Sequence, residues 1–220
     1  MSEQLIRSMS GQITARIREK IVNGAYPPGS QLLQDVIAAE FGVSKIPVRE
    51  ALVQLRAEGL VDVFAHRGFQ VRPLSAEEVD EVFRLRLLIE PAAVVEGSRR
   101  ACPSDHEAAR VAFAKLNDAL GAGELQESGD LNHAFHLALV VPRLQPITAE
   151  LLNRLHTLSQ RYIRLHLQPR GRVRRATKEH TALYQAWLAS DTAEVSRFTA
   201  AHIDAAREDL AQLLLQSPTR

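Results

Sequence analysis

The sequence predicts a mainly α-helical protein of two domains, an N-terminal winged helix-turn-helix followed by a C-terminal all-helical bundle. In the first third of the chain, two segments with helical apolar spacing are separated by a short turn containing glycine, and a segment of alternating apolar residues follows. From about residue 75 onward every apolar pattern has helical spacing. A chain of 220 residues can bury two modest cores, so we expect domains at residues 1–74 and 75–220.

The composition is typical of a folded protein that does not enter a membrane. Hydrophobic residues make up 45% of the chain, charged residues 24%, and the formal net charge is +1. No segment reaches the roughly 18 uninterrupted apolar residues of a membrane span, and the N-terminal residues lack the apolar core of a secretory signal. The single cysteine, Cys102, cannot form an internal disulfide. We therefore expect a cytoplasmic protein.

The first two helices are predicted from apolar spacing and from the turns that end them. Ile13, Ile17 and Ile21 recur four residues apart, and the segment YPPGS (26–30) after them cannot be helical. A shorter helical pattern spans residues 34–41 and is followed at once by a glycine. Together with the next helix, this arrangement is typical of a helix-turn-helix.

The third helix starts beside a proline. If Ser44 is the N-cap, Pro47 falls in the first turn, where backbone N–H groups have no intrahelical partner and a proline loses nothing. Val48, Leu52 and Leu55 then share one inward face. Such a helix, with polar residues at its start, has the geometry of a recognition helix whose first turns enter the major groove of DNA.

Basic residues mark the predicted DNA-binding face. Lys45 and Arg49 lie on the third helix, away from its apolar face. The alternating residues that follow predict a two-stranded hairpin, or wing, with His66, Arg67 and Gly68 at its tip. An arginine at such a tip can enter the minor groove or hold a phosphate. Each cation alone is typical of an ordinary surface, but together on one docking face they favour DNA binding.

The second domain is predicted to contain six helices, near residues 76–100, 104–121, 124–141, 147–168, 174–190 and 192–216. Ser75, followed three residues later by a glutamate, is a capping-box signal for the first of them, and Pro91 is expected to kink or loosen that helix. Between Arg154 and Lys178 there are eight basic residues and no acidic one. This run is either a solvated surface or a binding surface for an anion.

These stretches resemble a known family. The segments IREKIVNGAYPPGSQL (17–32), FGVSKIPVREAL (41–52), EGLV (58–61) and RGFQV (67–71) resemble the winged-helix domain of GntR-type transcription regulators. The remainder resembles the all-helical FCD effector domain of the FadR branch, through FRLRLLIEPAA (83–93), NHAFHLAL (132–139), EHTALYQA (179–186) and AAHI (200–203). Six helices would fit the VanR-like subgroup.

The resemblance implies a homodimeric, ligand-responsive regulator that binds a palindromic operator in double-stranded DNA, usually as a repressor, and is not an enzyme. The sequence departs from the family at two positions of the DNA-binding domain. Lys45 stands where arginine is usual, and lysine cannot make the two-pronged contact that arginine makes to guanine. Asp35 stands where some relatives carry a basic DNA contact, and an acidic side chain would repel a phosphate.

The resemblance also implies a metal site in the helical domain. Many FCD domains bind a divalent ion at positions that are occupied here by Asn132, His136, His180 and His202. Imidazole ligands favour Zn, with Ni as the second choice. Asn132 replaces the more frequent aspartate, which leaves more of the ion's charge to be balanced by an anionic ligand such as a carboxylate metabolite. Alternatives are a purely structural or absent metal and, more remotely, a metal-dependent hydrolase with an accessory DNA-binding domain.

Three arginines are candidates for holding the carboxylate of the effector. Arg84 and Arg86 lie on the first helix of the second domain, and Arg161 lies on the fourth. We prefer Arg86, because it aligns with an arginine that recurs in the family. Alternatively, these arginines are exposed or are paired with Glu81 or Glu90.

Overall fold

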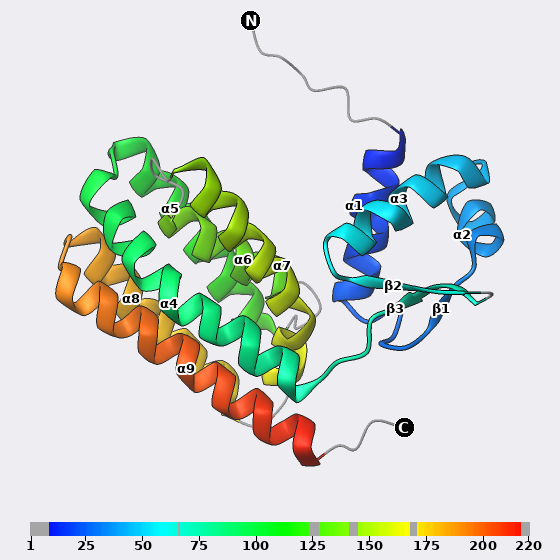
Figure 1. Ribbon diagram of the computed structural model, residues 1–220. Coiled ribbons are helices and arrows are strands. Elements are labelled where there is room, and N and C mark those ends of the chain that lie inside the picture. The colour runs from blue at the N-terminus through cyan, green and yellow to red at the C-terminus, as the bar shows by residue number, and fades with distance from the viewer. Residues whose placement is uncertain (1–8, 66, 124–127, 141–144, 168–170, 217–220) are drawn as a thin grey trace, which may run out of the picture. The chain divides into compact units, whose positions relative to one another are not determined.

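The computed structural model describes residues 9–65, 67–123, 128–140, 145–167 and 171–216. The chain divides into two compact units, Met1–Pro73 and Leu74–Arg220 (Figure 1). Helices dominate both units, and the mainly α prediction is confirmed. Among the helices described, none combines the length and apolarity needed to cross a membrane.

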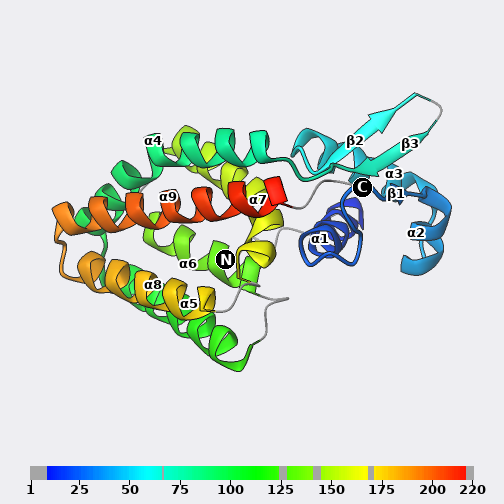
Figure 2. The ribbon, with the colours of Figure 1, turned by 90° about the horizontal axis from the view of Figure 1, so that it is seen from below.

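The N-terminal unit is a winged helix. Its described residues form, in chain order, α1 (Met9–Val22), β1 (Gln31–Leu32), α2 (Gln34–Phe41), α3 (Lys45–Ala57), β2 (Val61–Phe64) and β3 (Gly68–Val71). The three strands form an antiparallel sheet in the order β1-β3-β2. The β2–β3 hairpin has the predicted position and projects beyond the helices of this unit (Figure 2). The two-residue strand β1 is too short to leave an alternating pattern and was not predicted.

The core of this unit is built from the predicted apolar faces. The three isoleucines of α1 pack with the inward face of α3 and with residues of the sheet: Ile13, Ile17, Ile21, Val48, Ala51, Leu52, Leu55, Leu60, Val61, Phe69 and Val71. Gly42 ends α2 in the left-handed conformation at φ 67°, which a residue with a Cβ rarely adopts. That glycine therefore allows the tight turn between α2 and α3.

The C-terminal unit is a helical bundle. Its described residues form α4 (Ala76–Arg100), α5 (Pro103–Ala122), α6 (Ser128–Val140), α7 (Pro146–Leu167), α8 (Arg172–Leu188) and α9 (Thr192–Gln216). These positions agree closely with the six predicted helices. The expected start of the third one, at residues 124–127, lies outside the described residues. α4 runs alongside α9, and α6 packs against α4, α5 and α7 (Figures 1 and 2).

Ser75 is the N-cap of α4, as predicted, but the N–H that a capping-box glutamate would accept donates instead to the Tyr162 hydroxyl, over 3.3 Å. The Glu78 N–H donates to Ser75 Oγ over 3.0 Å. The Glu78 carboxylate accepts hydrogen bonds from Arg161 Nη1 at 3.0 Å and from the Tyr162 hydroxyl at 2.9 Å, so it links α4 to α7. α4 continues through Pro91 as a single helix to Arg100.

Candidate DNA interface and candidate metal centre

The start of α3 presents most of the predicted DNA-contacting residues to solvent. Ser44 is at the N-cap with extended backbone angles, although within the described chain its side chain makes no capping hydrogen bond. Lys45 is the first residue of the helix, and Pro47 follows within the first turn. Ser44, Lys45 and Arg49 are exposed, whereas Val48 is fully buried. The helix therefore anchors itself through its apolar face and leaves a polar face for DNA.

The two cations of this helix differ in their surroundings. Lys45 Nζ lies 2.5 Å from Asp35 Oδ1 on α2, and both side chains are largely exposed, at 66% and 70%. No described residue forms an ion pair or a side-chain hydrogen bond with Arg49. The Lys45 charge is thus offset before DNA binds, whereas the Arg49 charge is not. Asp35, which the sequence suggested would repel phosphate, instead pairs with the neighbouring lysine.

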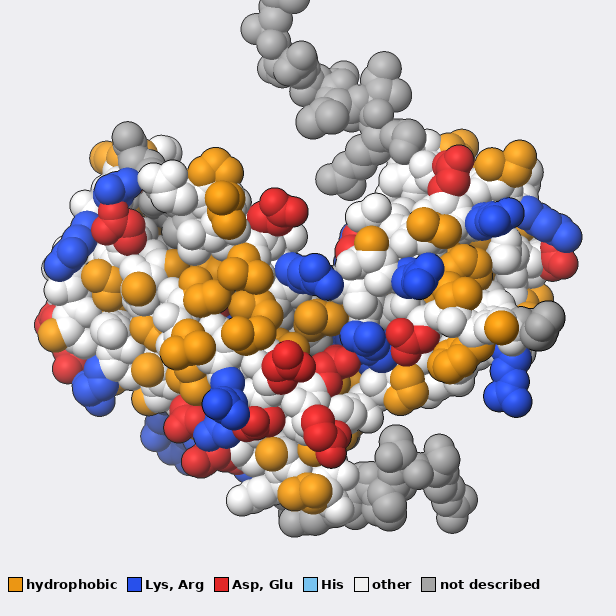
Figure 3. Space-filling model, in the orientation of Figure 1, with side chains coloured by type: hydrophobic (Ala, Val, Ile, Leu, Met, Phe, Trp, Pro, Cys, Tyr) orange, Lys and Arg blue, Asp and Glu red, His pale blue; other side chains and the backbone are white. Residues whose placement is uncertain are grey.

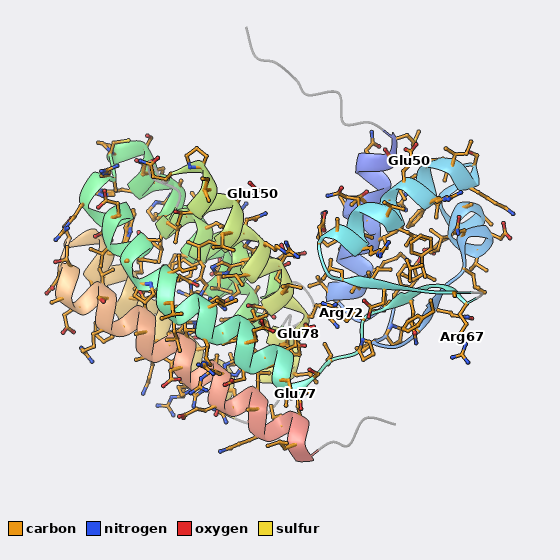
Figure 4. All side chains as sticks on the ribbon, viewed as in Figure 1. Glu50, Arg67, Arg72, Glu77, Glu78 and Glu150 are labelled. Atoms are coloured by element: carbon orange, nitrogen blue, oxygen red, sulfur yellow. The ribbon has the colours of Figure 1, made fainter. Side chains whose placement is uncertain are left out.

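The tip of the wing carries a further exposed cation. Arg67 extends away from the sheet at the end of the β2–β3 hairpin (Figure 4). Its backbone is fixed, because its N–H donates to the Phe64 carbonyl over 3.1 Å and its carbonyl accepts from Gln31 Nε2 over 3.2 Å. Gly68 follows at φ 73°, a conformation that favours glycine. His66, the other predicted tip residue, lies outside the described residues.

Three of the four predicted metal ligands converge in the helical unit. His136 on α6, His180 on α8 and His202 on α9 each offer a ring nitrogen, and these nitrogens lie within 4.8 Å of one another. His180 Nε2 and His202 Nε2 are 3.3 Å apart. Two nitrogens bound at about 2.05 Å to one tetrahedral Zn²⁺ would be separated by about 3.3 Å. All three side chains are buried, at 0%, 2% and 8% exposed.

The fourth predicted ligand, Asn132, is near the same place. It is buried, precedes His136 by one helical turn and lines the same cavity as His180 and His202. Its side-chain amide offers one neutral oxygen atom that can bind a metal ion. The donor set at this position of the fold is therefore three imidazoles and an amide.

The protonation states and unpaired atoms of the cluster suit a cation. Burial lowers the pKa of His136 to about 3, despite the opposing effect of Glu90, and burial also lowers the pKa of His180 well below its ordinary value. Both rings are therefore neutral at physiological pH, as metal ligation requires. Within the described chain, both nitrogens of His136 and Nδ1 of His180 are buried without a hydrogen-bond partner. A buried polar atom without a hydrogen-bond partner destabilises the folded state. A divalent metal bound to these nitrogens would remove that cost, so the residues fit such an ion.

Two carboxylates contact the histidines, one half-buried (Glu179) and one fully buried (Glu90), and the sequence did not indicate that they belong to the site. Glu179 Oε2 lies 2.8 Å from His202 Nδ1. Glu90 is fully buried, with Oε1 at 3.3 Å from His136 Nδ1 and Oε2 at 3.2 Å from Nε2 of His156. Glu90 is one helical turn after Arg86, and Glu179 directly precedes His180. This local spacing was the only signal in the sequence.

The three candidate arginines have different surroundings. Arg86 lines the cavity beside the histidines, but its Nε donates to Glu90 Oε2 over 2.8 Å and its Nη1 donates to Ser159 Oγ over 3.3 Å. Arg161 is buried and directed at Glu78. Arg84 is exposed and lies near Asp80 on the surface of α4. Among the described residues, Arg86 lines the cavity and the other two do not.

The cavity itself is small and largely apolar. Its volume is about 20 Å³, where a water molecule needs about 10 to 15 Å³ by the same measure. Apolar side chains from five helices form most of its wall, with Arg86, Asn132, His166, His180 and His202 as the polar groups; the apolar residues are Phe83, Leu116, Leu120, Ile163, Leu167, Ala176, Ile203 and Ala206. An ion fits this space, and a larger ligand requires the wall to move.

The basic run between Arg154 and Lys178 is partly neutralised by acidic residues of other helices. Arg172 and Arg175 both contact Asp209 on α9, and Arg161 contacts Glu78 on α4. These three cations therefore serve helix packing in this structure rather than an open anion-binding surface.

The N-terminal unit is a winged helix with exposed cations on its third helix and wing, and the C-terminal unit is a helical domain with a buried cluster of potential metal ligands. This combination defines the class of DNA-binding transcription regulators with a sensor domain. Comparison with known families supports this assignment. The family described as "Bacterial regulatory proteins, gntR family" matches residues 9–71, and the FCD domain matches residues 81–205. The chain belongs to the GntR family of transcription regulators and carries an FCD domain.

Individual relatives agree with the family. The HTH-type transcriptional regulator McbR of Escherichia coli (strain K12) is 28% identical over 67% of this chain and 67% of its own length. The HTH-type transcriptional repressor GlaR of the same organism is 29% identical over 85% of this chain and 89% of its own. A solved structure of E. coli McbR/YncC has a TM-score of 0.82 at 24% identity, covers 95% of this chain and 98% of that one, and shows the same fold. Both families and these relatives are regulators, so the prediction that the protein is not an enzyme is confirmed and the hydrolase alternative is set aside.

Proposed function

We propose that this regulator is a homodimeric, cytoplasmic repressor that releases a palindromic operator when a small carboxylate metabolite binds to a divalent metal in the helical domain. The observation that carries this proposal is the convergence of His136, His180 and His202, whose ring nitrogens lie within 4.8 Å of one another. Within the described chain, both nitrogens of His136 and Nδ1 of His180 are buried without a hydrogen-bond partner. A bound ion would act as a Lewis acid that anchors the carboxylate. Zn is the first candidate for this ion, and Ni is the second.

The charges around the cluster support an anionic ligand. A divalent ion adds two positive charges, while the histidines and Asn132 add none. The pKa of Glu90 is raised by burial, but the charge of Arg86 and the nearby His156 and His136 outweigh that effect and hold it well below the ordinary value. Glu90 is therefore ionised, yet Arg86 offsets its charge. Arg175 Nε likewise lies 3.2 Å from Glu179 Oε1 and offsets that charge, so the charge of the ion remains for an anionic ligand to balance.

The small cavity links ligand binding to a change of shape. A metabolite does not fit in about 20 Å³, so it must bind an arrangement in which helices of the wall have moved. A ligand that binds that arrangement more tightly increases its population. This coupling is how the helical domain would alter the DNA-binding domains. The same small volume also favours a second candidate function, in which the metal only holds the helices together.

An apolar surface supports the homodimer. Exposed leucines and an isoleucine lie on α4 and α7, two helices that pack against each other: Leu85, Leu88, Ile147 and Leu151. Figure 3 shows apolar side chains gathered on one face of the helical unit. Leu88 is 78% and Ile147 is 82% exposed, and contiguous exposed apolar residues commonly mark an interface. A symmetric dimer formed there would present two recognition helices to the two half-sites of a palindrome.

The test is elemental analysis of purified, tag-free protein, combined with titration against labelled operator-length DNA. The variants are wild type, His180→Ala and the control His106→Ala, which removes a histidine outside the cluster. We expect about one metal per chain in wild type and in His106→Ala, and none in His180→Ala. Carboxylates are then screened for release of DNA from the metal-loaded protein. Bound metal without release by any carboxylate would favour the structural role, and no metal after Zn and Ni are supplied would refute the metal-based proposal.

A further inference from the structure

Two acidic side chains, Glu179 and Glu90, each contact a ring nitrogen of the histidine cluster. His202 Nδ1 is 2.8 Å from Glu179 Oε2. An ionised carboxylate accepts but cannot donate a hydrogen bond, so this contact fixes the proton of His202 on Nδ1. The lone pair is then on Nε2, the atom that lies 3.3 Å from His180 Nε2.

Glu179 is suited to this role by its charge. Arg175 Nε is 3.2 Å from the other carboxylate oxygen of Glu179. The carboxylate is therefore ionised and is held from both sides in the orientation that contacts His202.

Glu90 has a matching position behind a second histidine of the cluster. Its Oε1 is 3.3 Å from His136 Nδ1, a close polar contact rather than a well-aligned hydrogen bond. Arg86 holds the same carboxylate through Nε at 2.8 Å and Nη2 at 3.2 Å. With Glu90 behind Nδ1, Nε2 is the nitrogen of His136 that remains to face an ion.

We propose that Glu179 and Glu90 are positioning residues of the metal centre. Glu179 fixes His202, and Glu90 fixes His136, so that each presents Nε2 to the ion. Carboxylates hydrogen-bonded to metal-bound histidines orient the ring and increase its basicity, and their loss commonly lowers metal affinity by about 10- to 100-fold. This inference rests on the proposed metal site and goes beyond it by naming which carboxylates support which ligands.

The main test is Glu179→Gln, which keeps the size of the side chain and removes its charge. Zn²⁺ affinity is measured by competition with a chromogenic chelator, and Co²⁺ is used as a spectroscopic probe of the coordination geometry. We expect a loss of Zn²⁺ affinity of about 10- to 100-fold and a weaker visible Co²⁺ absorption. Glu179→Asp, which retains the charge, should recover part of the affinity. Glu194→Gln is the control, since Glu194 is on α9 but is paired at the surface with Arg197.

The role of Glu179 as a metal-positioning group can be separated from a role in folding. Urea unfolding of the metal-free variants measures the fold directly, while affinity and the Co²⁺ spectrum measure the centre. Glu90→Gln should also weaken metal binding, but it leaves the buried Arg86 without its counter-charge and can destabilise the fold, so Glu179→Gln decides the question. Wild-type affinity and an unchanged Co²⁺ spectrum in Glu179→Gln would overturn the inference. Absence of metal from wild type would overturn the proposed site and the inference together, whereas His180→Ala tests the site alone.

Discussion

The ion pair between Asp35 and Lys45 leads to a specific prediction about DNA affinity. Lys45 is the first residue of α3, the predicted recognition helix, and its ammonium lies 2.5 Å from Asp35. We expect Asp35→Asn to tighten binding to all DNA sequences, because it frees Lys45 to neutralise a phosphate and removes a charge that repels one. The increase should be independent of sequence, since lysine at this position contacts the backbone rather than reading a base.

The expected magnitude follows from exposure and from counterion release. Both partners are more than 60% exposed, so the ion pair stabilises the fold by only about 0 to 1 kcal/mol and its loss should leave the fold intact. One additional phosphate contact changes the slope of log affinity against log salt by about 0.9. If Asp35→Asn and wild type bind equally at 1 M salt, this difference in slope makes the variant bind about eightfold more tightly at 0.1 M salt.

The assay is fluorescence anisotropy with operator and random duplexes at several salt concentrations. Adding Lys45→Ala to Asp35→Asn should remove the gain that comes through the lysine. Glu107→Gln is a matched control, because it makes the same charge change on the helical unit, where Glu107 pairs with Arg110. If Asp35→Asn leaves both affinity and salt slope at the wild-type values while Lys45→Ala weakens binding, the lysine reaches phosphate despite the aspartate and the reasoning is refuted.

Three further predictions concern base reading, packing and pH. Arg49→Ala should weaken operator binding by about 1 to 3 kcal/mol and relax the base preference at one position; unchanged binding across a panel of operator variants would show that Arg49 does not read a base. Gly97→Ala should lower the free energy of unfolding by about 2 to 4 kcal/mol, because its Cβ would lie 2.1 Å from the backbone oxygen of Leu139. Gly121→Ala, where a Cβ meets nothing within 4 Å, should instead stabilise by about 0.5 to 1 kcal/mol, and similar urea midpoints for these two variants would contradict this. The metal-free protein should lose stability as pH falls below about 6.5, because unfolded histidines then bind protons before the folded ones do, at up to about 1.4 kcal/mol per pH unit for each group. A flat urea profile between pH 7.5 and 5, where the carboxylates do not yet contribute, would argue against it. The histidines concerned have pKa values that burial lowers to about 4 (His133, His156) or about 3 (His136, His166).

The helices and the wing could be predicted from the sequence because they depend on local chemistry. Isoleucines four residues apart, the left-handed Gly42 and Pro47 in a first turn constrain the backbone within a few residues of themselves. The exposed positions of Lys45 and Arg49 follow from the same helical spacing. The two-residue strand β1 did not follow from it, because its pairing with β3 depends on residues almost forty positions further along the chain.

The sequence by itself determined the fold class and the position of the third helix, and its resemblance to the FCD family supplied the candidate metal ligands. Only the tertiary structure brought His136, His180 and His202 together from three helices, and only it showed that Asp35 offsets Lys45, that Arg161 faces Glu78 and that Glu179 and Glu90 stand behind the histidines. The reason is physical. Apolar periodicity records which face of a helix is buried, but it does not record which buried polar groups of different helices meet, and those pairings decide the charge and protonation of the site.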